Sequence, residues 1–177
     1  MATYKERLIA ASKLNSALYE EVEADTTAMN QAMLTVILSS VAAGIGTIGR
    51  GGVAGIVLGA VAALAGWFVW ALLTYLIGTK LLPQPQTQAT LGEMLRTIGF
   101  SSAPGLIRVA GIIPGLTGIV FFAASVWMLV AMVIGVRQAL DYTSTLRAVV
   151  VCLIGWLLQV IIIGLLFYSF GGLPRTF

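Results

Sequence analysis

The sequence contains no histidine, a single cysteine and few charged residues. Without histidine, it lacks the commonest general acid or base and the commonest metal ligand of proteins. Cys152 cannot form a disulfide within the chain, and we expect it to be a small buried side chain. Ser101, Ser102 and Ser125 have no histidine to activate them, and the sequence has neither a nucleophile-elbow nor a phosphate-loop motif. We therefore expect the protein to have no enzymatic activity, no cofactor and no metal site.

Charged residues make up 10% of the 177 residues and apolar residues 59%. An ordinary soluble domain is about 25% charged and about 45–50% apolar, so a soluble fold of this size could not bury the apolar surface. Ten Lys and Arg oppose seven Asp and Glu, which is too slight an excess to indicate a nucleic-acid surface. The composition predicts an all-α integral membrane protein.

Residues 1–25 are too polar to cross a membrane. Apolar residues recur there at spacings of three and four, which predicts one amphipathic helix. We interpret it as an interfacial helix in the headgroup layer, with its cations near anionic lipid. The apolar stripe comprises Tyr4, Leu8, Ala11, Leu14, Leu18 and Val22, and the cations are Lys5, Arg7 and Lys13.

Four acidic residues follow at Glu20, Glu21, Glu23 and Asp25. Asp25 precedes two threonines and the first long apolar segment, so we interpret the acids as a helix cap. The alternative is a cation site made of carboxylates, but no glycine-punctuated calcium loop accompanies them.

Residues 26–170 form the predicted transmembrane domain, and 171–177 are a short tail. Five spans are expected, at about 26–49, 53–78, 99–115, 116–136 and 146–170, because a span needs about 20 apolar residues. The first is the least apolar, so we expect it to pack mostly against other helices. The third is interrupted by Pro104, Arg108 and Pro114 and is predicted to be broken, with neighbours that satisfy its backbone.

Between the second and third spans, Pro83 and Pro85 mark a loop. Thr90, or a residue beside it, can cap a new helix with Glu93 in its first turn.

Small residues in two spans predict close helix contacts. Gly55 and Gly59 form a GxxxG pattern that Ala63 extends. Gly111 and Gly115 in the third span are assigned to packing as well. Packing inside the bundle is the favoured interpretation, and an oligomer contact is the alternative.

Charge placement gives the orientation. With five spans the termini lie on opposite sides, whereas a four-span alternative weakens the charge asymmetry. A cytoplasmic N-terminus leaves Arg50 and Arg175 outside and obeys the positive-inside rule. The cations then placed inside are Lys5, Arg7, Lys13, Lys80, Arg96, Arg137 and Arg147.

Arg108 is the strongest candidate for a functional residue, because a guanidinium at membrane depth is energetically costly and is usually paired or facing water. Glu93 and Asp141 are its candidate partners. The favoured interpretation is structural: Arg108 reaches the cytoplasmic face or locks the broken span to the linker before the fifth span. The alternative is a site for an anionic lipid headgroup or small anion, completed by Arg96 and by Arg137 or Arg147.

Three motifs carry a resemblance to a known family. Gly99-Phe100-Ser101-Ser102-Ala103-Pro104 resembles the Gly-Tyr-x-x-Ala-Pro signature of the Ypt-interacting-protein (Yip) family, with Phe100 in place of tyrosine. The short helix 94–98 precedes it, as in that family, and Ile134-Gly135-Val136-Arg137 follows. Residues 18–25, LYEEVEAD, are similar to the segment before the first span of bacterial members.

The resemblance covers about residues 18–170 and implies five spans with a cytoplasmic N-terminus. Eukaryotic relatives bind prenylated GTPases, but the chain lacks their Asp-Leu-Tyr-Gly-Pro motif and long N-terminal region, so GTPase binding is not expected. We expect a bacterial cytoplasmic-membrane protein that acts as a non-catalytic scaffold or accessory subunit, as a homo-oligomer or within a larger membrane complex. The alternative is lipid or small-solute binding or transport near Arg108.

Overall fold

The computed structural model describes residues 2–171, without the side chains of 48–51, 166, 167, 170 and 171. Within this part of the chain the fold is all-α, with seven α-helices and no strand. Four segments are long and apolar enough to cross a membrane: Thr26–Gly46, Gly52–Leu81, Thr117–Ala139 and Thr145–Leu165. The protein is therefore a polytopic membrane protein.

The N-terminal segment forms two helices, α1 (Tyr4–Ser12) and α2 (Ser16–Ala24). The prediction of one continuous helix was wrong, because the chain turns at Leu14, whose φ is +59°. The Asn15 side chain accepts the Ala17 N–H and caps α2, and such a cap competes with continuation of the preceding helix. The apolar stripe packs against the bundle, with Ala11 and Val22 fully buried.

Asp25 caps the first span as predicted, because its side chain accepts the Thr27 N–H at the start of a 3₁₀ turn, η1 (Thr26–Ala28). Helix α3 (Met29–Gly46) follows, and α4 (Ile48–Leu76) continues into a π-helical turn, η2 (Ile77–Leu81). The first span is the most buried of the four and the second the least, which is the order expected if α3 has the most contact with other helices.

Helix α5 (Leu91–Phe100) begins at the predicted cap, where the Thr90 and Glu93 side chains each accept the other residue's backbone N–H. It ends four residues before Pro104, whose ring would clash with the carbonyl of Phe100 in a continuing α-helix. The chain then forms a 3₁₀ helix, η3 (Ala103–Ile112), and 3₁₀ runs of this length are uncommon. The sequence predicted this break in the third apolar segment.

Segment α5–η3 runs parallel to α3 in close backbone contact. A Cβ atom added to Gly99 would lie 2.7 Å from the Cβ of Ala32, one added to Gly105 would overlap Ser39, and one added to Gly46 would overlap the Arg108 carbonyl. From Ala32 to Gly46, α3 rises by ~21 Å at ~1.5 Å per residue. The shorter stretch from Gly99 to Gly111 rises by a similar ~22 Å, because the 3₁₀ helix rises ~2.0 Å per residue.

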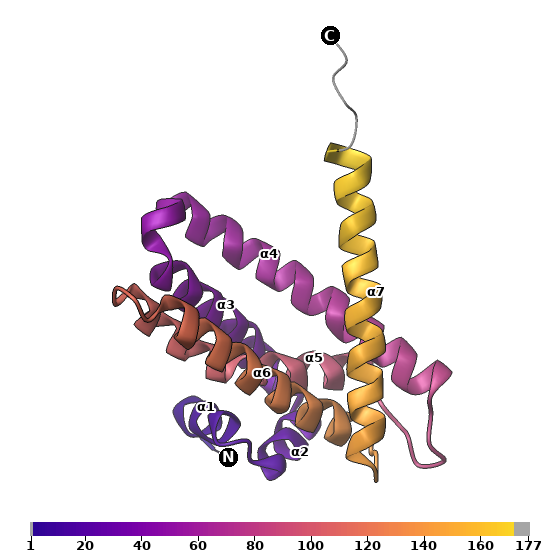
Figure 1. Ribbon diagram of the computed structural model, residues 1–177. Coiled ribbons are helices and arrows are strands. Elements are labelled where there is room, and N and C mark those ends of the chain that lie inside the picture. Colours follow the sequence, from indigo (N-terminus) through magenta and orange to yellow (C-terminus); the bar gives the residue numbers. More distant parts are fainter. Residues whose placement is uncertain (1, 172–177) are drawn as a thin grey trace.

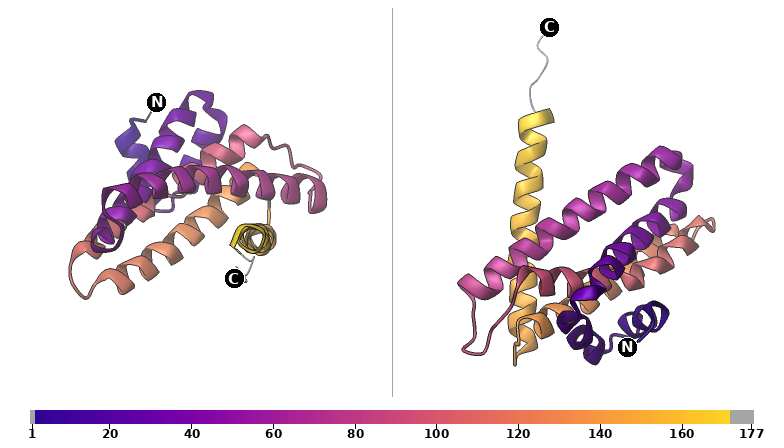
Figure 2. Two further views of the ribbon diagram at one scale, coloured as in Figure 1. Left: turned by 90° about the horizontal axis from the view of Figure 1, so that it is seen from above. Right: turned by 180° about the vertical axis from the view of Figure 1, so that it is seen from behind.

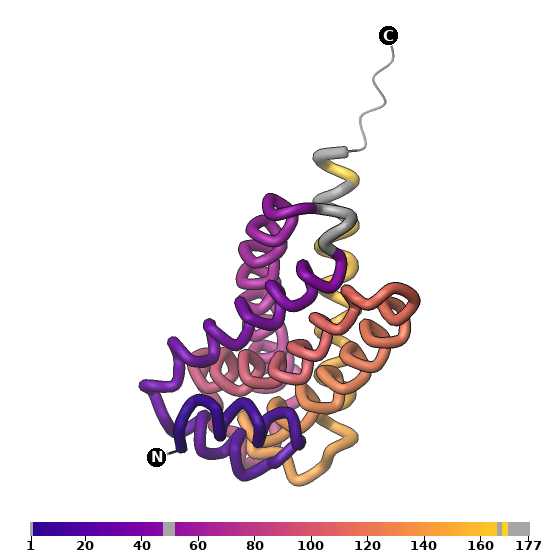
Figure 3. The backbone as a smooth tube through the Cα atoms, turned by 90° about the vertical axis from the view of Figure 1, so that its left-hand side faces the viewer, coloured from indigo at the N-terminus to yellow at the C-terminus, as the bar shows by residue number. Residues whose placement is uncertain are grey.

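Helix α6 (Thr117–Ala139) returns beside η3, and α7 (Thr145–Gly171) leads away from the end of α6 and crosses α4 steeply (Figure 1). We call the end with α2, the start of α3, the end of α6 and the start of α7 the base, and the opposite end the far end. Helices α1 and α2 cover the base, while the C-terminal end of α7 points away from it (Figures 1 and 3). Viewed along its axis, α7 stands at the edge of the bundle (Figure 2, left).

The predicted packing glycines have different surroundings. Gly111 is packed, because a Cβ there would lie 2.9 Å from the Phe121 ring. Gly115 has a φ of +84° and no neighbour within 4 Å of such a Cβ, so it serves the turn before α6. Gly55 and Gly59 are exposed and also lack neighbours within 4 Å. The prediction that they pack inside the bundle was wrong.

Candidate functional site

The three segments that resemble family motifs meet at the base. Tyr19 of α2 is fully buried. Its ring lies beside Gly135 of α6, where an added Cβ would be 3.2 Å from the ring and 2.9 Å from the Ser101 hydroxyl. Burial raises the pKa of Tyr19 to about 12, so the phenol stays neutral. Each motif thus supplies one surface of a single contact.

Ser101 links the end of α5 to α6. Its hydroxyl lies 2.9 Å from the Thr97 carbonyl and 3.2 Å from that of Ala131, and can donate to either. The neighbouring Phe100 ring is fully buried in one cluster with Tyr19, Val22 and other residues of α1–α3. These contacts assign both residues a packing role.

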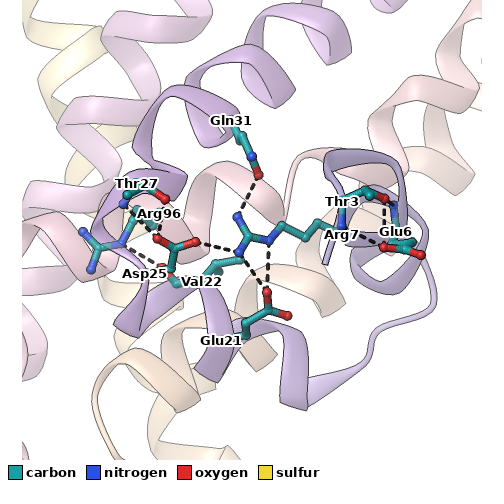
Figure 4. Close-up of polar contacts among 9 residues, drawn as sticks. All are labelled: Thr3, Glu6, Arg7, Glu21, Val22, Asp25, Thr27, Gln31 and Arg96. Carbon is teal, nitrogen blue, oxygen red and sulfur yellow. Dashed lines mark hydrogen bonds and ion pairs between the residues drawn. The ribbon is translucent and has the colours of Figure 1, made fainter. Parts of the chain in front are cut away.

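Arg7 is the centre of a buried polar network that joins α1, α2 and α3 (Figure 4). Its Nη2 donates to Glu21 at 2.8 Å and to Asp25 at 2.6 Å, and its Nη1 donates to the Gln31 side chain at 2.9 Å. Only 2% of the Arg7 side chain is exposed. The prediction that Arg7 lies among lipid headgroups was therefore wrong, while Lys5 and Lys13 are exposed as expected.

Sequence reasoning missed this network because it treated every N-terminal cation as a headgroup contact. A signal was present in the spacing. Arg7 lies three residues after Tyr4 and four before Ala11, so it shares the apolar stripe, where an unpaired charge is costly. The acids able to pair with it are in the next helix.

Arg96 of α5 is buried against the end of α2. Its Nε donates to the Val22 carbonyl at 2.8 Å, and its Nη2 makes a short hydrogen bond to the Glu23 carbonyl. The last carbonyls of a helix have no partner within that helix, so Arg96 closes the C-terminus of α2. This geometry gives Arg96 a role in locking α5 to α2.

Arg137 holds the linker between α6 and α7. Its Nε donates to the Tyr142 carbonyl at 3.1 Å and its Nη1 to the Thr145 hydroxyl at 3.1 Å. The Tyr142 hydroxyl in turn donates to the Leu82 carbonyl at 2.6 Å, which ties the linker to the end of η2. Arg147, in the first turn of α7, is exposed.

Arg108 lies away from all these residues, at the far end. Its backbone carbonyl contacts Gly46 at the end of α3, and its Nη2 donates to the Ser125 hydroxyl at 3.3 Å. Glu93 caps α5 and Asp141 lies in the linker at the base, so the prediction that these acids are its partners was wrong. Nor does the structure bring Arg96, Arg137 or Arg147 to Arg108.

No set of three or more His, Cys, Asp or Glu side chains is arranged to hold a metal ion among the residues placed in the structure. Of the four acids expected to form a cap or a cation site, Asp25 caps the first span, and Asp25 and Glu21 both bind Arg7. Hydrogen bonds from Thr27 and Arg7 hold the pKa of Asp25 at about 2. The geometry at the base is that of a clamp between helices.

The sequence profile of the Yip1 domain matches residues 16–167. The chain belongs to the Yip1 domain family. No curated protein and no solved structure gives a significant match to it. The match begins at Ser16, the first residue of α2, so α1 precedes the family domain and Arg7 fastens it there.

Glu23, which sequence reasoning grouped with Glu20, Glu21 and Asp25 as a cap, has different surroundings. Burial raises the pKa of its carboxyl to about 7, with further contributions from the negative charges of Asp141, Glu93 and Glu20, and Arg96 acts in the opposite direction. These groups lie on α2, α5 and the α6–α7 linker. The Glu23 side chain therefore titrates where three elements of the base meet.

Replacing Arg7 by Gln removes the cation that neutralises Glu21 and Asp25. Because water can reach Glu21, whose side chain is 38% exposed, we expect the free energy of unfolding in detergent to fall by about 1–3 kcal/mol. Proteolysis between α1 and α2 should also accelerate. Lys13→Gln removes the same charge from an exposed site and should have little effect. Equal effects of the two substitutions would contradict the assigned role of Arg7.

The raised pKa of Glu23 makes the docking of α2 depend on pH. A carboxyl whose pKa rises on docking, from 4.5 to about 7, favours docking when protonated, so the stabilisation is complete below pH 4.5 and is lost as pH rises through 7. Hydrogen exchange of the α2 amides, corrected for intrinsic rates, should lose about threefold protection from pH 5.5 to 8, less than full linkage because solvent screens the site. Glu23→Gln should remove this dependence, and its persistence in that variant would assign it to another group.

Proposed function

We propose that this Yip1-domain protein is a non-catalytic membrane scaffold or accessory subunit that crosses the membrane five times. The third crossing would be α5–η3. The close contact of this segment with α3 supports the third crossing. The contact begins where Gly99 lies beside Ala32 and continues to Gly111, which lies beside Gly46. Helix α3, the segment α5–η3 and α7 all lead away from the base, whereas α4 and α6 lead back to it, with α7 steeply inclined to the other helices (Figure 1).

The charge distribution supports a cytoplasmic base. Arg7 and Arg96 lie in the contacts of α2, and Arg137 and Arg147 flank the linker before α7. Lys80 is in η2, next to the carbonyls that Tyr142 binds. At the far end, the chain carries Arg50 near the start of α4 and Arg108 in η3. The larger number of cations at the base than at the far end supports a cytoplasmic base by the positive-inside rule.

The observation that carries the scaffold proposal is the free face of α4. Gly55 and Gly59 are exposed and have no atom of the chain within 4 Å of a Cβ placed on them. Leu58, which flanks these glycines on the helix, is 69% exposed. In a membrane, small residues let a second helix approach closely, so that backbones pack and weak hydrogen bonds form. A helix of another copy, or of a partner subunit, fits this face.

A chain with five crossings has its two ends on opposite sides of the membrane. A reporter protein that is active only in the cytoplasm should be active when fused before Met1 and inactive when fused behind Phe177. A reporter that is active only outside should give the reverse pattern. Both reporters indicating the cytoplasm at both ends would contradict the third crossing, because four crossings return the chain to the starting side.

The scaffold proposal predicts that the purified chain self-associates or retains a partner through α4. Gly59→Leu places a bulky side chain on the contact face. It should shift the native mass in mild detergent towards that of one copy and raise the dissociation constant of the complex at least tenfold. Gly118→Leu is the matched control, since Gly118 is also exposed, helical and without neighbours. A wild-type chain that is strictly a single copy without partners would refute the proposal.

A further inference from the structure

Arg108 has most of its hydrogen-bonding capacity unused. A guanidinium has five N–H donors, and the structure gives the side chain one hydrogen bond, 3.3 Å long, to Ser125. Its Nε atom is buried and has no partner. The guanidinium carbon lies 5.6 Å from the centre of the Phe121 ring, so the aromatic face supports one side of the cation. No ordinary packing requirement explains an arginine held in this way.

The chain offers no carboxylate side chain to neutralise this cation. All seven acidic residues precede α3, start α5 or lie in the α6–α7 linker, and none occurs between 26 and 92, 94 and 140, or 142 and 177. The end of α3, the second half of η3 and the start of α6 surround Arg108 at the far end, and all lie inside the first two intervals. A buried or half-buried cation is paired or hydrated as a rule, so any counterion of Arg108 comes from outside the chain.

The depth of Arg108 identifies the class of counterion. Its carbonyl contacts Gly46, the last residue of α3, and Phe121 is one turn from Thr117, the first residue of α6. One turn is ~5.4 Å, so the guanidinium lies within reach of the membrane surface, as arginines near span ends do. The anions concentrated at that depth are the phosphodiesters of lipids, and the guanidinium fork matches phosphate oxygens.

We propose that Arg108, supported by Phe121 and Ser125, binds the phosphate group of an anionic phospholipid at the far end of the bundle. Assigning this lipid to the outer leaflet rests on the proposed orientation, whereas the binding itself does not. The bound headgroup would join η3 to α6 and satisfy donors that the chain leaves open.

The test measures binding of phosphatidylglycerol, phosphatidylcholine and inorganic phosphate to the full chain in mild detergent by native mass spectrometry. We expect wild-type protein to prefer phosphatidylglycerol and Arg108→Gln to bind it about fivefold more weakly, the loss expected for one interfacial cation. Arg147→Gln removes an exposed arginine at the base and should leave this site unchanged. Arg108→Lys keeps the charge without the fork and should give an intermediate affinity.

Equal phosphatidylglycerol binding by wild type and Arg108→Gln would overturn the proposal. Displacement of the lipid by millimolar inorganic phosphate, with equal affinity for both, would retain an anion site at Arg108 but overturn its assignment to lipid. If Arg108→Gln does not fold, phenylglyoxal labelling of the wild type decides, because phosphatidylglycerol should protect Arg108 about fivefold more than phosphatidylcholine does. Equal protection would overturn the proposal. Neither the reporter fusions nor the number of copies in the complex enters these readouts, so failure of the scaffold proposal remains distinguishable.

Discussion

The fold depends on the close contact between α3 and the segment α5–η3. This segment contains Pro104, Arg96 and Arg108 and is too polar and irregular to face lipid along its whole length, because lipid cannot satisfy free backbone groups. It is buried only because Gly46, Gly99 and Gly105 let two backbones approach to distances that a single Cβ would prevent. The 3₁₀ geometry adds the necessary length, since it lets a short segment match the rise of α3.

The contact at one end of that segment determines the arrangement of the base. Helix α5 positions Arg96 against the last carbonyls of α2 and Ser101 against α6. Helix α2 then presents Tyr19 to Gly135 and Glu21 to Arg7. Each helix at the base is therefore held by at least one contact from a different part of the chain. This is the reason that the three motifs, far apart in the sequence, share one location.

The sequence was informative where local chemistry decides structure. Prolines predicted the broken third segment, the Thr90–Glu93 pair predicted the start of α5, and continuous apolar runs predicted four spans. The sequence was misleading where the structure depends on which of several possible partners a residue contacts. Arg7 pairs with acids of the next helix instead of lipid, and the break at Leu14 depends on the Asn15 cap, which competes with a strong apolar stripe. Gly55 and Gly59 have the spacing of packed residues, but spacing alone does not say whether the partner helix belongs to the same chain.

The distribution of acids and bases gives the two ends different requirements. At the base, cations and carboxylates occur together, so the chain neutralises its own charges and can fasten α1, α2 and α5 without help. At the far end, arginines occur without Asp or Glu. An uncompensated guanidinium near a membrane surface is stabilised only by water or by anions of that surface. The far end therefore depends on its surroundings for charge balance, and the exposed face of α4 extends into the same half of the molecule. A protein with a self-sufficient base and an incomplete far half is suited to hold other membrane components, and this division of the molecule supports a scaffold over an enzyme.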